Sequence, residues 1–189
     1  NCTATNCSNF FQVSSFYLLH SGQSMSSPQL KKALLAFDFD NTVVDANTDL
    51  EVMKLHAGPL PEEIEKLYCE HNGWNDYMRA IFALLHSENI TIDKIKEKVL
   101  EIPLASGMKE LFSHLADDSY EVVIISDANT LFIEWLMDKH GISSQVDRIF
   151  SNPAEVTGEG KLTISYYHRQ DWCDLSSNNM CKGEARVQN

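Results

Sequence analysis

Short apolar runs that end abruptly in polar residues are the first regular feature of the sequence. One run covers residues 33–37 (ALLAF) and stops at Asp38, and another covers residues 122–125 (VVII) and stops at Ser126. Runs of this length are too short for a helix and are typical of strands buried on both faces of a parallel sheet. A third short strand is predicted at residues 147–151 (DRIFS).

Helical periodicity fills the intervals between these strands. Apolar residues recur at i, i+3, i+4 and i+7 in two places, so each set lines one face of a helix. The two sets are Met78, Ile81, Phe82 and Leu85, and Met108, Leu111, Phe112 and Leu115. Residues 130–140 (TLFIEWLMDKH) are also helical in character, and Gly141 is the predicted C-cap that ends this helix.

The alternation of strands and helices predicts a doubly wound α/β fold with a parallel sheet. The interval from Asp45 to about Pro103 is too long for one crossover connection, so we expect a small helical cap inserted after the first strand. The predicted α/β core comprises residues 33–46 and 104–189, and the cap comprises residues 47–103. Residues 1–32 are predicted to be a poorly ordered N-terminal extension, with Met25 as the expected natural start.

The charge and cysteine content narrow the choice of partner and compartment. The 189-residue chain has a formal net charge of -12, which argues against a general nucleic-acid binder because phosphate backbones attract Lys and Arg. Small phosphorylated substrates stay open, since a bound cation can reverse the local field. No stretch has the length of a membrane span. The five scattered cysteines favour reduced thiols in a cytoplasmic enzyme, while the oligomeric state stays open.

Acidic and hydroxyl side chains follow the first two predicted strands, at the sheet edge where open α/β folds bind ligands. Asp38 and Asp40 follow the first strand, and Ser126 ends the second, just before a helix whose first N–H groups favour an anion. Two carboxylates in different environments can divide the work between a nucleophile and a general acid and base. An isolated Asp-x-Asp is also typical of a solvated acidic turn. The hydroxyl donor on the neighbouring strand favours a phosphoryl-transfer site.

The motifs at these strand ends resemble those of a known superfamily. LLAFDFDNTVVD resembles the first motif of the haloacid dehalogenase superfamily, Asp-x-Asp-x-Thr after an apolar strand, and VVIISDAN resembles its second motif. DFDNTVVDANTD, IISDANTLFIEWL, SNPAEV, YYH and NNMCKG are more closely similar to the phosphoethanolamine/phosphocholine phosphatase family. That family has relatives acting on pyridoxal phosphate, thiamine phosphate or pyrophosphate. The resemblance covers about residues 33–183.

The resemblance implies a magnesium-dependent phosphatase. It would hydrolyse a small phosphomonoester, such as phosphoethanolamine or phosphocholine, through an aspartyl-phosphate intermediate. Asp38 would be the nucleophile and a Mg²⁺ ligand through its carboxylate. Asp40 would be the general acid and base, and its backbone carbonyl would also ligate Mg²⁺.

Four further roles come from the same resemblance. Ser126 would hold the phosphoryl oxygens, and Lys182 would neutralise their charge. Asp49 and Asp127 stand at positions associated in that family with the cationic headgroup of the substrate. These roles are physically sensible, because a carboxylate complements an ammonium group and an ammonium group stabilises a phosphoryl oxygen.

The resemblance ends after Lys182. The fourth motif of the family, Gly-Asp-Gly-x-x-Asp after an apolar strand, is expected beyond this point, whereas this sequence ends in GEARVQN. We therefore expect the C-terminal core strands to be truncated and Mg²⁺ binding to be weak. A hypothesis of another class follows, in which the chain is a truncated, catalytically weak or inactive product that binds phosphate or a partner. Within the enzyme hypothesis, the alternative substrates are pyridoxal phosphate, thiamine phosphate and pyrophosphate.

Overall fold

The structure of the chain is a computed structural model that describes residues 32–71, 73–117, 119–174 and 176–185. The predicted N-terminal extension, apart from Lys32, and the expected start at Met25 lie outside the described residues. Seven α-helices, a short 3₁₀ helix (Ser143–Gln145) and five strands are assigned in this part of the chain.

A three-stranded parallel sheet forms the centre of the α/β core. Its strands are β1 (Ala33–Phe37), β2 (Tyr120–Asn129) and β3 (Arg148–Asn152), in the spatial order β1-β2-β3. Phe37 pairs with Ile124, and Ile125 pairs with Phe150. The three strands lie where the apolar runs predicted them, and the predicted α/β class with a parallel sheet is confirmed.

β2 is longer than the sequence predicted. The apolar run stops at Ser126, whereas β2 continues to Asn129, which pairs with Asn152 after a shift in register. The side chain of Asn152 explains the difference, since its Nδ2 donates to the carbonyls of Asp127 (2.7 Å) and Ala128 (2.9 Å). These two bonds keep the backbone extended beyond Ser126.

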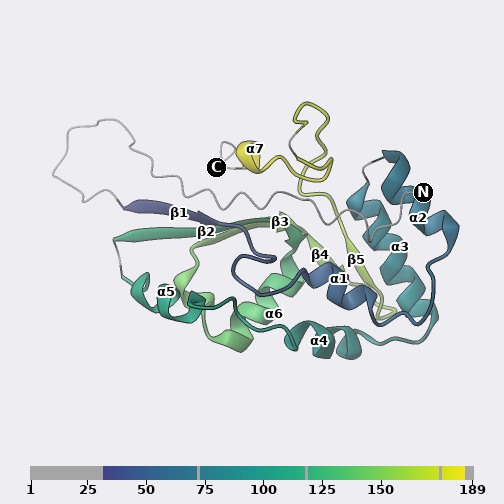
Figure 1. Cartoon of the computed structure of the whole chain (residues 1–189), viewed down its shortest axis with the longest axis horizontal. Coiled ribbons are helices and arrows are strands. Elements are labelled where there is room, and N and C mark those ends of the chain that lie inside the picture. Colours follow the sequence, from purple (N-terminus) through teal and green to yellow (C-terminus); the bar gives the residue numbers. More distant parts are fainter. Residues whose placement is uncertain (1–31, 72, 118, 175, 186–189) are drawn as a thin grey trace.

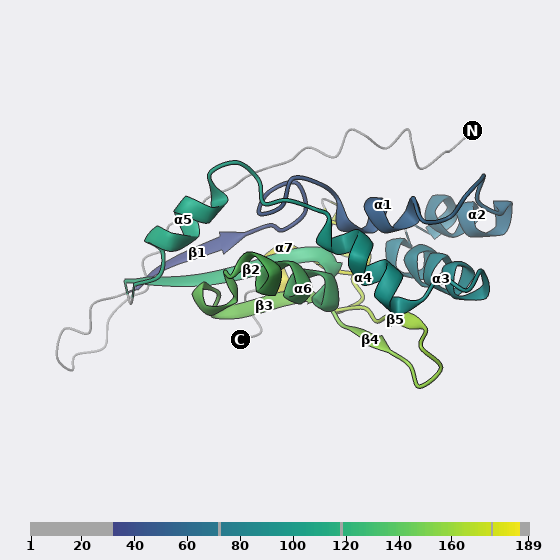
Figure 2. The ribbon, with the colours of Figure 1, turned by 90° about the horizontal axis from the view of Figure 1, so that it is seen from below.

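Helices cover both faces of the sheet (Figures 1 and 2). On one face lie α5 (Met108–His114) and α6 (Thr130–His140), and on the other lies the short α7 (Lys182–Ala185). α6 begins with the Asn129 side chain as its N-cap and ends at Gly141, whose φ of 69° is the left-handed conformation that glycine adopts without strain. Every helix in the described part of the chain is too short or too polar to cross a membrane.

Four helices separate β1 from α5 and lie beyond the carboxyl ends of the strands (Figure 1). They are α1 (Thr48–Met53), α2 (Glu62–His71), α3 (Trp74–Ser87) and α4 (Ile92–Leu100). An antiparallel hairpin of β4 (Ala154–Val156) and β5 (Leu162–Ile164) packs against α3. A separate cap of residues 47–103 stays a prediction, because these helices share one hydrophobic core with the sheet.

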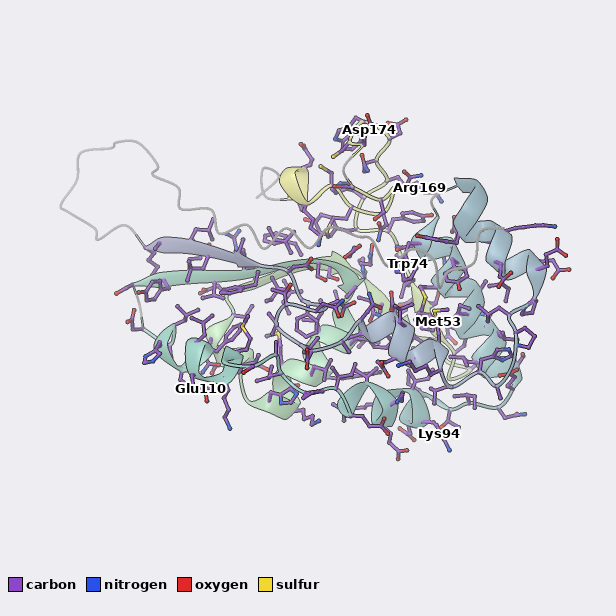
Figure 3. The ribbon with its side chains drawn as sticks, in the orientation of Figure 1. Met53, Trp74, Lys94, Glu110, Arg169 and Asp174 are labelled. Carbon is purple, nitrogen blue, oxygen red and sulfur yellow. The ribbon has the colours of Figure 1, made fainter. Side chains whose placement is uncertain are left out.

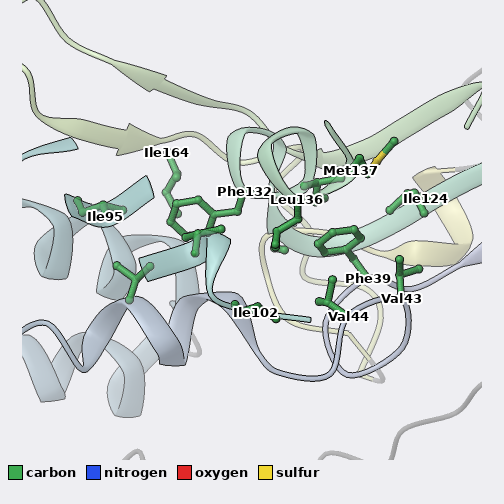
Figure 4. Packing of buried hydrophobic residues seen from close by; sticks show 14 of the residues in the cluster. Phe39, Val43, Val44, Ile95, Ile102, Ile124, Phe132, Leu136, Met137 and Ile164 are labelled. Carbon is green, nitrogen blue, oxygen red and sulfur yellow. The ribbon is translucent and has the colours of Figure 1, made fainter. Parts of the chain in front are cut away.

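This shared core fixes the turn that follows β1. Phe39, Val43 and Val44 are fully buried in that turn. They point toward Leu136 of α6 and Ile124 of β2 (Figure 4). Burial of three large side chains within six residues is worth several kcal/mol, at roughly 1.5–3 kcal/mol each. The hydrophobic core therefore fixes the turn at the carboxyl edge of the sheet.

Candidate functional site

Asp38 and Asp40 flank a side chain that is locked into the core. The carbonyl of Phe39 accepts hydrogen bonds from the backbone N–H groups of Thr42, Val43 and Val44, at 3.2, 2.9 and 3.2 Å. The chain therefore curls tightly immediately after β1. Since Phe39 points into the core, the carboxylates on either side of it lie at the carboxyl edge of the sheet. Asp38 is held there by its own turn, because its Oδ1 accepts from Phe39 N at 2.7 Å.

A lysine from the far end of the described chain completes a charged cluster. Lys182 Nζ donates to Asp38 Oδ2 at 2.6 Å and lies 3.6 Å from Asp127 Oδ1. Burial lowers the pKa of Lys182, but the negative charges of Asp127 and Asp38 outweigh it and hold this pKa above its usual range. The lysine is therefore an ammonium ion near neutral pH, placed between two carboxylates.

Asp40 lies in a drier environment than Asp38. Burial raises the pKa of Asp40 well above its ordinary value, and the negative charge of Asp49 raises it further. Thr48 Oγ1 donates to Asp40 Oδ2 at 3.3 Å and partly opposes this rise. Asp40 Oδ1 is buried and receives no hydrogen bond from any described group. Burial and the neighbouring charge therefore favour the protonated form of Asp40, which is the form that a general acid needs.

Asp49 is buried in α1 beneath an aromatic cluster. Trp74 Nε1 donates to Asp49 Oδ2 at 2.8 Å, and the rings of Tyr68 and Tyr77 lie 5.5 and 5.7 Å from that of Trp74. Burial raises the pKa of Asp49 to about 7, with the Trp74 bond opposing the rise and the Asp127 charge adding to it. Figure 3 shows Trp74 between the helices beyond the sheet and the carboxyl ends of the strands.

Ser126 reaches the same edge from β2. The pairing of Phe37 with Ile124 places Asp38 and Ser126 just past aligned positions on neighbouring strands. The Ser126 hydroxyl is fully buried and accepts a hydrogen bond from Ala128 N at 3.3 Å. α6 begins four residues later and directs its first N–H groups toward this edge.

The structure brings the six predicted residues to one edge of the sheet, although not all are in direct contact. Asp38, Lys182 and Asp127 form one cluster, and repulsion of Asp40 by Asp49 and Asp127 links the other carboxylates to it. The contact between Thr48 and Asp40 was not predicted from the sequence, because it forms only when the first residue of α1 packs against Asp40. The hydrogen bond from Trp74 to Asp49 also had no signal in the sequence.

The oxygen donors fit a magnesium ion that is shared with substrate. In the described part of the chain, no three acidic, imidazole or thiol side chains converge closely enough to cage a metal on their own. Mg²⁺ commonly uses one or two carboxylates and completes its shell with phosphate and water. The carboxylate of Asp38 and the backbone carbonyl of Asp40 are donors of that kind.

Comparison with known proteins finds phosphatases among the relatives of this chain. Residues 33–187 match the family described as "Putative Phosphatase". Pyridoxal phosphate phosphatase PHOSPHO2 of Mus musculus is 36% identical over 154 residues, which are 80% of this chain and 63% of that protein. The phosphoethanolamine/phosphocholine phosphatase of Homo sapiens is 33% identical over 178 residues, which are 93% of this chain and 66% of that protein.

A solved structure shares the fold. It is described as a phospho-aspartyl intermediate analogue of phosphoserine phosphatase and aligns with a TM-score of 0.50 and 27% identity, over 70% of this chain and 61% of that one. The chain spans 63–66% of the length of the first five curated relatives, which are probable or named phosphatases. The motifs, the fold and these identities together show that the chain belongs to the family described as "Putative Phosphatase", within the haloacid dehalogenase superfamily.

Proposed function

We propose that this chain hydrolyses a small phosphomonoester that carries a cationic amine, such as phosphoethanolamine or phosphocholine. The observation that carries the proposal is the cluster at the sheet edge, where Lys182 Nζ lies 2.6 Å from Asp38 Oδ2 and 3.6 Å from Asp127 Oδ1. An ammonium group there can neutralise the oxygens of a phosphoryl group that approaches Asp38.

The reaction proceeds in two displacements. The Asp38 carboxylate attacks phosphorus in line with the leaving alcohol, so that a bond from Asp38 to phosphorus forms as the ester bond breaks. Asp40 gives its proton to the leaving oxygen, which its raised pKa allows. Asp40 then takes a proton from the water that attacks the aspartyl phosphate, and inorganic phosphate leaves. Ser126 and Lys182 hold the phosphoryl oxygens throughout.

Magnesium belongs to this proposal, and the Asp38 carboxylate and the Asp40 backbone carbonyl would be its ligands. When bound, Mg²⁺ supplies positive charge that offsets the phosphoryl oxygens and lessens their repulsion of the nucleophile. The residues of the chain supply the attacking oxygen, the proton and the ammonium group.

The headgroup preference rests on buried negative charge beside an aromatic ring. Asp49 is only 3% exposed and is held by the Trp74 indole, and Asp127 lies nearby. A cationic amine in this position would offset the repulsion between the two carboxylates and could also lie against the Trp74 ring. A neutral headgroup would leave that repulsion in place.

The direct test compares turnover of phosphoethanolamine, phosphocholine and a neutral aryl phosphate, with added Mg²⁺ and with Asp38→Asn as the control. Rapid acid quenching followed by mass spectrometry should find one phosphoryl group on the peptide that contains Asp38. Turnover that persists in the Asp38→Asn variant, or a phosphoryl group on another residue, would overturn the mechanism.

Pyridoxal phosphate is a second candidate substrate. Four of the first five curated relatives are named pyridoxal phosphate phosphatases. Tyr68 and Trp74 are partly exposed and offer ring faces to a planar pyridine, and Asp49 could accept from its ring N–H. A higher kcat/KM for pyridoxal phosphate than for phosphoethanolamine would favour this candidate.

A further inference from the structure

Three buried asparagines join parts of the chain that lie far apart in sequence. Asn75 is in the first turn of α3, Asn152 ends β3, and Asn179 precedes α7. Their exposed fractions are 0%, 0% and 1%. The site described above uses none of the three side chains directly. A buried amide must satisfy its donors and acceptors, so their hydrogen bonds define what each residue does.

The amide of Asn75 is at the centre of the group. Its Oδ1 accepts from Asn179 Nδ2 at 3.0 Å, and its Nδ2 donates to Asn152 Oδ1 at 3.0 Å and to the carbonyl of Ser165 at 2.9 Å. Both donor hydrogens and the acceptor oxygen of Asn75 are therefore in use. An aspartate of the same shape could not replace it, since both partners of Nδ2 are themselves acceptors.

The chain of bonds continues from Asn152 into the site. Its Nδ2 donates to the carbonyls of Asp127 and Ala128, and its Oδ1 also accepts from Tyr167 N at 3.2 Å. Each amide is thus fixed in orientation by the next, from Asn179 through Asn75 to Asn152. We name these three residues the asparagine relay.

Both ends of the asparagine relay lead to the same ion pair. At one end is the backbone of Asp127, whose Oδ1 lies 3.6 Å from Lys182 Nζ. At the other end Asn179 stands three residues before Lys182, the first residue of α7. Asn75 itself follows Trp74, the residue that holds Asp49. One turn of α3 is therefore connected to the supports of all three charged side chains.

We propose that Asn75 is a positioning residue. It acts through Asn152 and Asn179 to hold Asp127 and Lys182 in their positions around the phosphate. This inference rests on the proposed phosphatase function. Displacement of Lys182 by a fraction of an ångström would weaken its contact with the phosphoryl oxygens and slow the chemical step. A purely structural role predicts a different result, namely less folded protein with unchanged kinetics per folded molecule.

The experiment compares three variants of the full chain with the wild type. Asn75→Ser removes the central amide, and Asn179→Ala breaks one bond while leaving Asn75 joined to Asn152. Arg79→Gln is the matched control, because Arg79 lies one turn along α3 and donates to the carbonyl of Ile164 at 3.1 and 3.0 Å. It ties α3 to β5 without contacting the asparagine relay. Circular dichroism gives the Tm and the folded fraction of each variant.

Two readouts are corrected for the folded fraction. The first is kcat/KM for a neutral aryl phosphate, which we expect to fall about tenfold to a hundredfold in Asn75→Ser and Asn179→Ala. The second is binding of inorganic phosphate by calorimetry, which we expect to weaken at least about threefold. The double variant should be no worse than the worse single variant, since both break one chain of bonds. Arg79→Gln should stay within about twofold on both readouts, even with a comparable loss of Tm.

The outcomes separate this inference from the function on which it rests. Unchanged kinetics and phosphate affinity in Asn179→Ala would overturn the positioning role, even if Asn75→Ser did not fold. Equal losses in Arg79→Gln would also overturn it, because they would indicate general loosening of α3. If the wild type binds phosphate without turnover, the proposed function fails and phosphate affinity alone decides the role of Asn75. If the wild type does not bind phosphate, both proposals fail.

Discussion

Lys182 Nζ lies 2.6 Å from Asp38 Oδ2, although the two residues are 144 positions apart in the chain. The carboxylate comes from the turn after β1, near the start of the described chain. The ammonium group comes from the first residue of α7, near its end. Their contact lies at the carboxyl edge of the sheet, where Ser126 and Asp127 of β2 also lie.

Replacement of Asp38 by asparagine should abolish turnover while leaving the fold intact. The two side chains are nearly isosteric, and Oδ1 can still accept from Phe39 N. The amide cannot form the covalent intermediate, so kcat should fall by more than about a thousandfold. Steady-state kinetics with an aryl phosphate measures this loss, and circular dichroism checks the fold. More than a tenth of the wild-type activity would exclude Asp38 as the nucleophile.

Replacement of Lys182 by methionine should weaken both phosphate binding and the chemical step. The variant keeps the apolar stem but removes the charge that faces Asp38 and Asp127. We expect kcat/KM to fall about a hundredfold to a thousandfold, the usual effect of one lost transition-state contact. The Tm should change little, because the ion pair is partly exposed and such pairs contribute little. A large fall in Tm with unchanged kcat/KM would make Lys182 a structural residue.

Much of this fold could be predicted because its signals are local. The apolar runs gave β1, β2 and β3, and the apolar face of Met78, Ile81, Phe82 and Leu85 lies buried along α3 as predicted. Hydrophobic periodicity is a property of neighbouring positions, so a single sequence is enough to read it. The extension of β2 to Asn129 was missed, because it depends on the side chain of Asn152 on another strand.

The candidate site was likewise predictable only where its signals are local. Asp38, Asp40 and Ser126 could be proposed from their place after apolar strands, while Lys182, Asp49 and Asp127 came from the family resemblance alone. The asparagine relay had no sequence signal, since asparagine is usually an exposed turn residue. Its members at positions 75, 152 and 179 become partners only when three separate segments meet. Long-range polar contacts of this kind have no period that a sequence could reveal.

Replacement of Asp49 by asparagine should alter substrate preference. If Asp49 faces an ammonium headgroup, the loss of its charge should cost about 2–5 kcal/mol in kcat/KM for phosphoethanolamine. A neutral aryl phosphate should lose far less, since it offers no cation to that carboxylate. The ratio of the two kcat/KM values is the measurement. Equal losses on both substrates would assign Asp49 a structural or general catalytic role.

The same Asp49→Asn change should move the alkaline limb of the kcat profile to lower pH. Burial is the main cause of the raised pKa of Asp40, and the negative charge of Asp49 is the next. Without that charge the pKa of Asp40 falls, so the general acid loses its proton at a lower pH. The profile should be recorded with a neutral alkyl phosphate. Asp45→Asn is the control, because Asp45 is an exposed neighbour in the same loop. An unmoved limb would contradict the assignment of Asp40.

Stability should depend on pH through Asp49 in a direction opposite to that of most carboxyl groups. Its pKa is about 7 in the folded chain and about 3.8 in the unfolded chain, so between these values the folded state binds the extra proton. The stabilisation of the folded chain by this proton is complete below pH 3.8 and is lost as the pH rises through 7. Asp49→Asn carries no charge and can still accept from Trp74 Nε1. Without Mg²⁺ or phosphate, the Tm of the variant should exceed that of the wild type at both pH 5 and pH 8, because the wild type loses this stabilisation progressively between pH 3.8 and 7. The excess should be larger at pH 8 than at pH 5 by about 4 °C or more, since each kcal/mol shifts the Tm of a chain this size by about 2–4 °C. Thermal melts at the two pH values measure the difference. A variant that is destabilised equally at both would mean that Asp49 is ionised in the folded chain throughout, and that the Trp74 bond, rather than the lost charge, dominates its contribution.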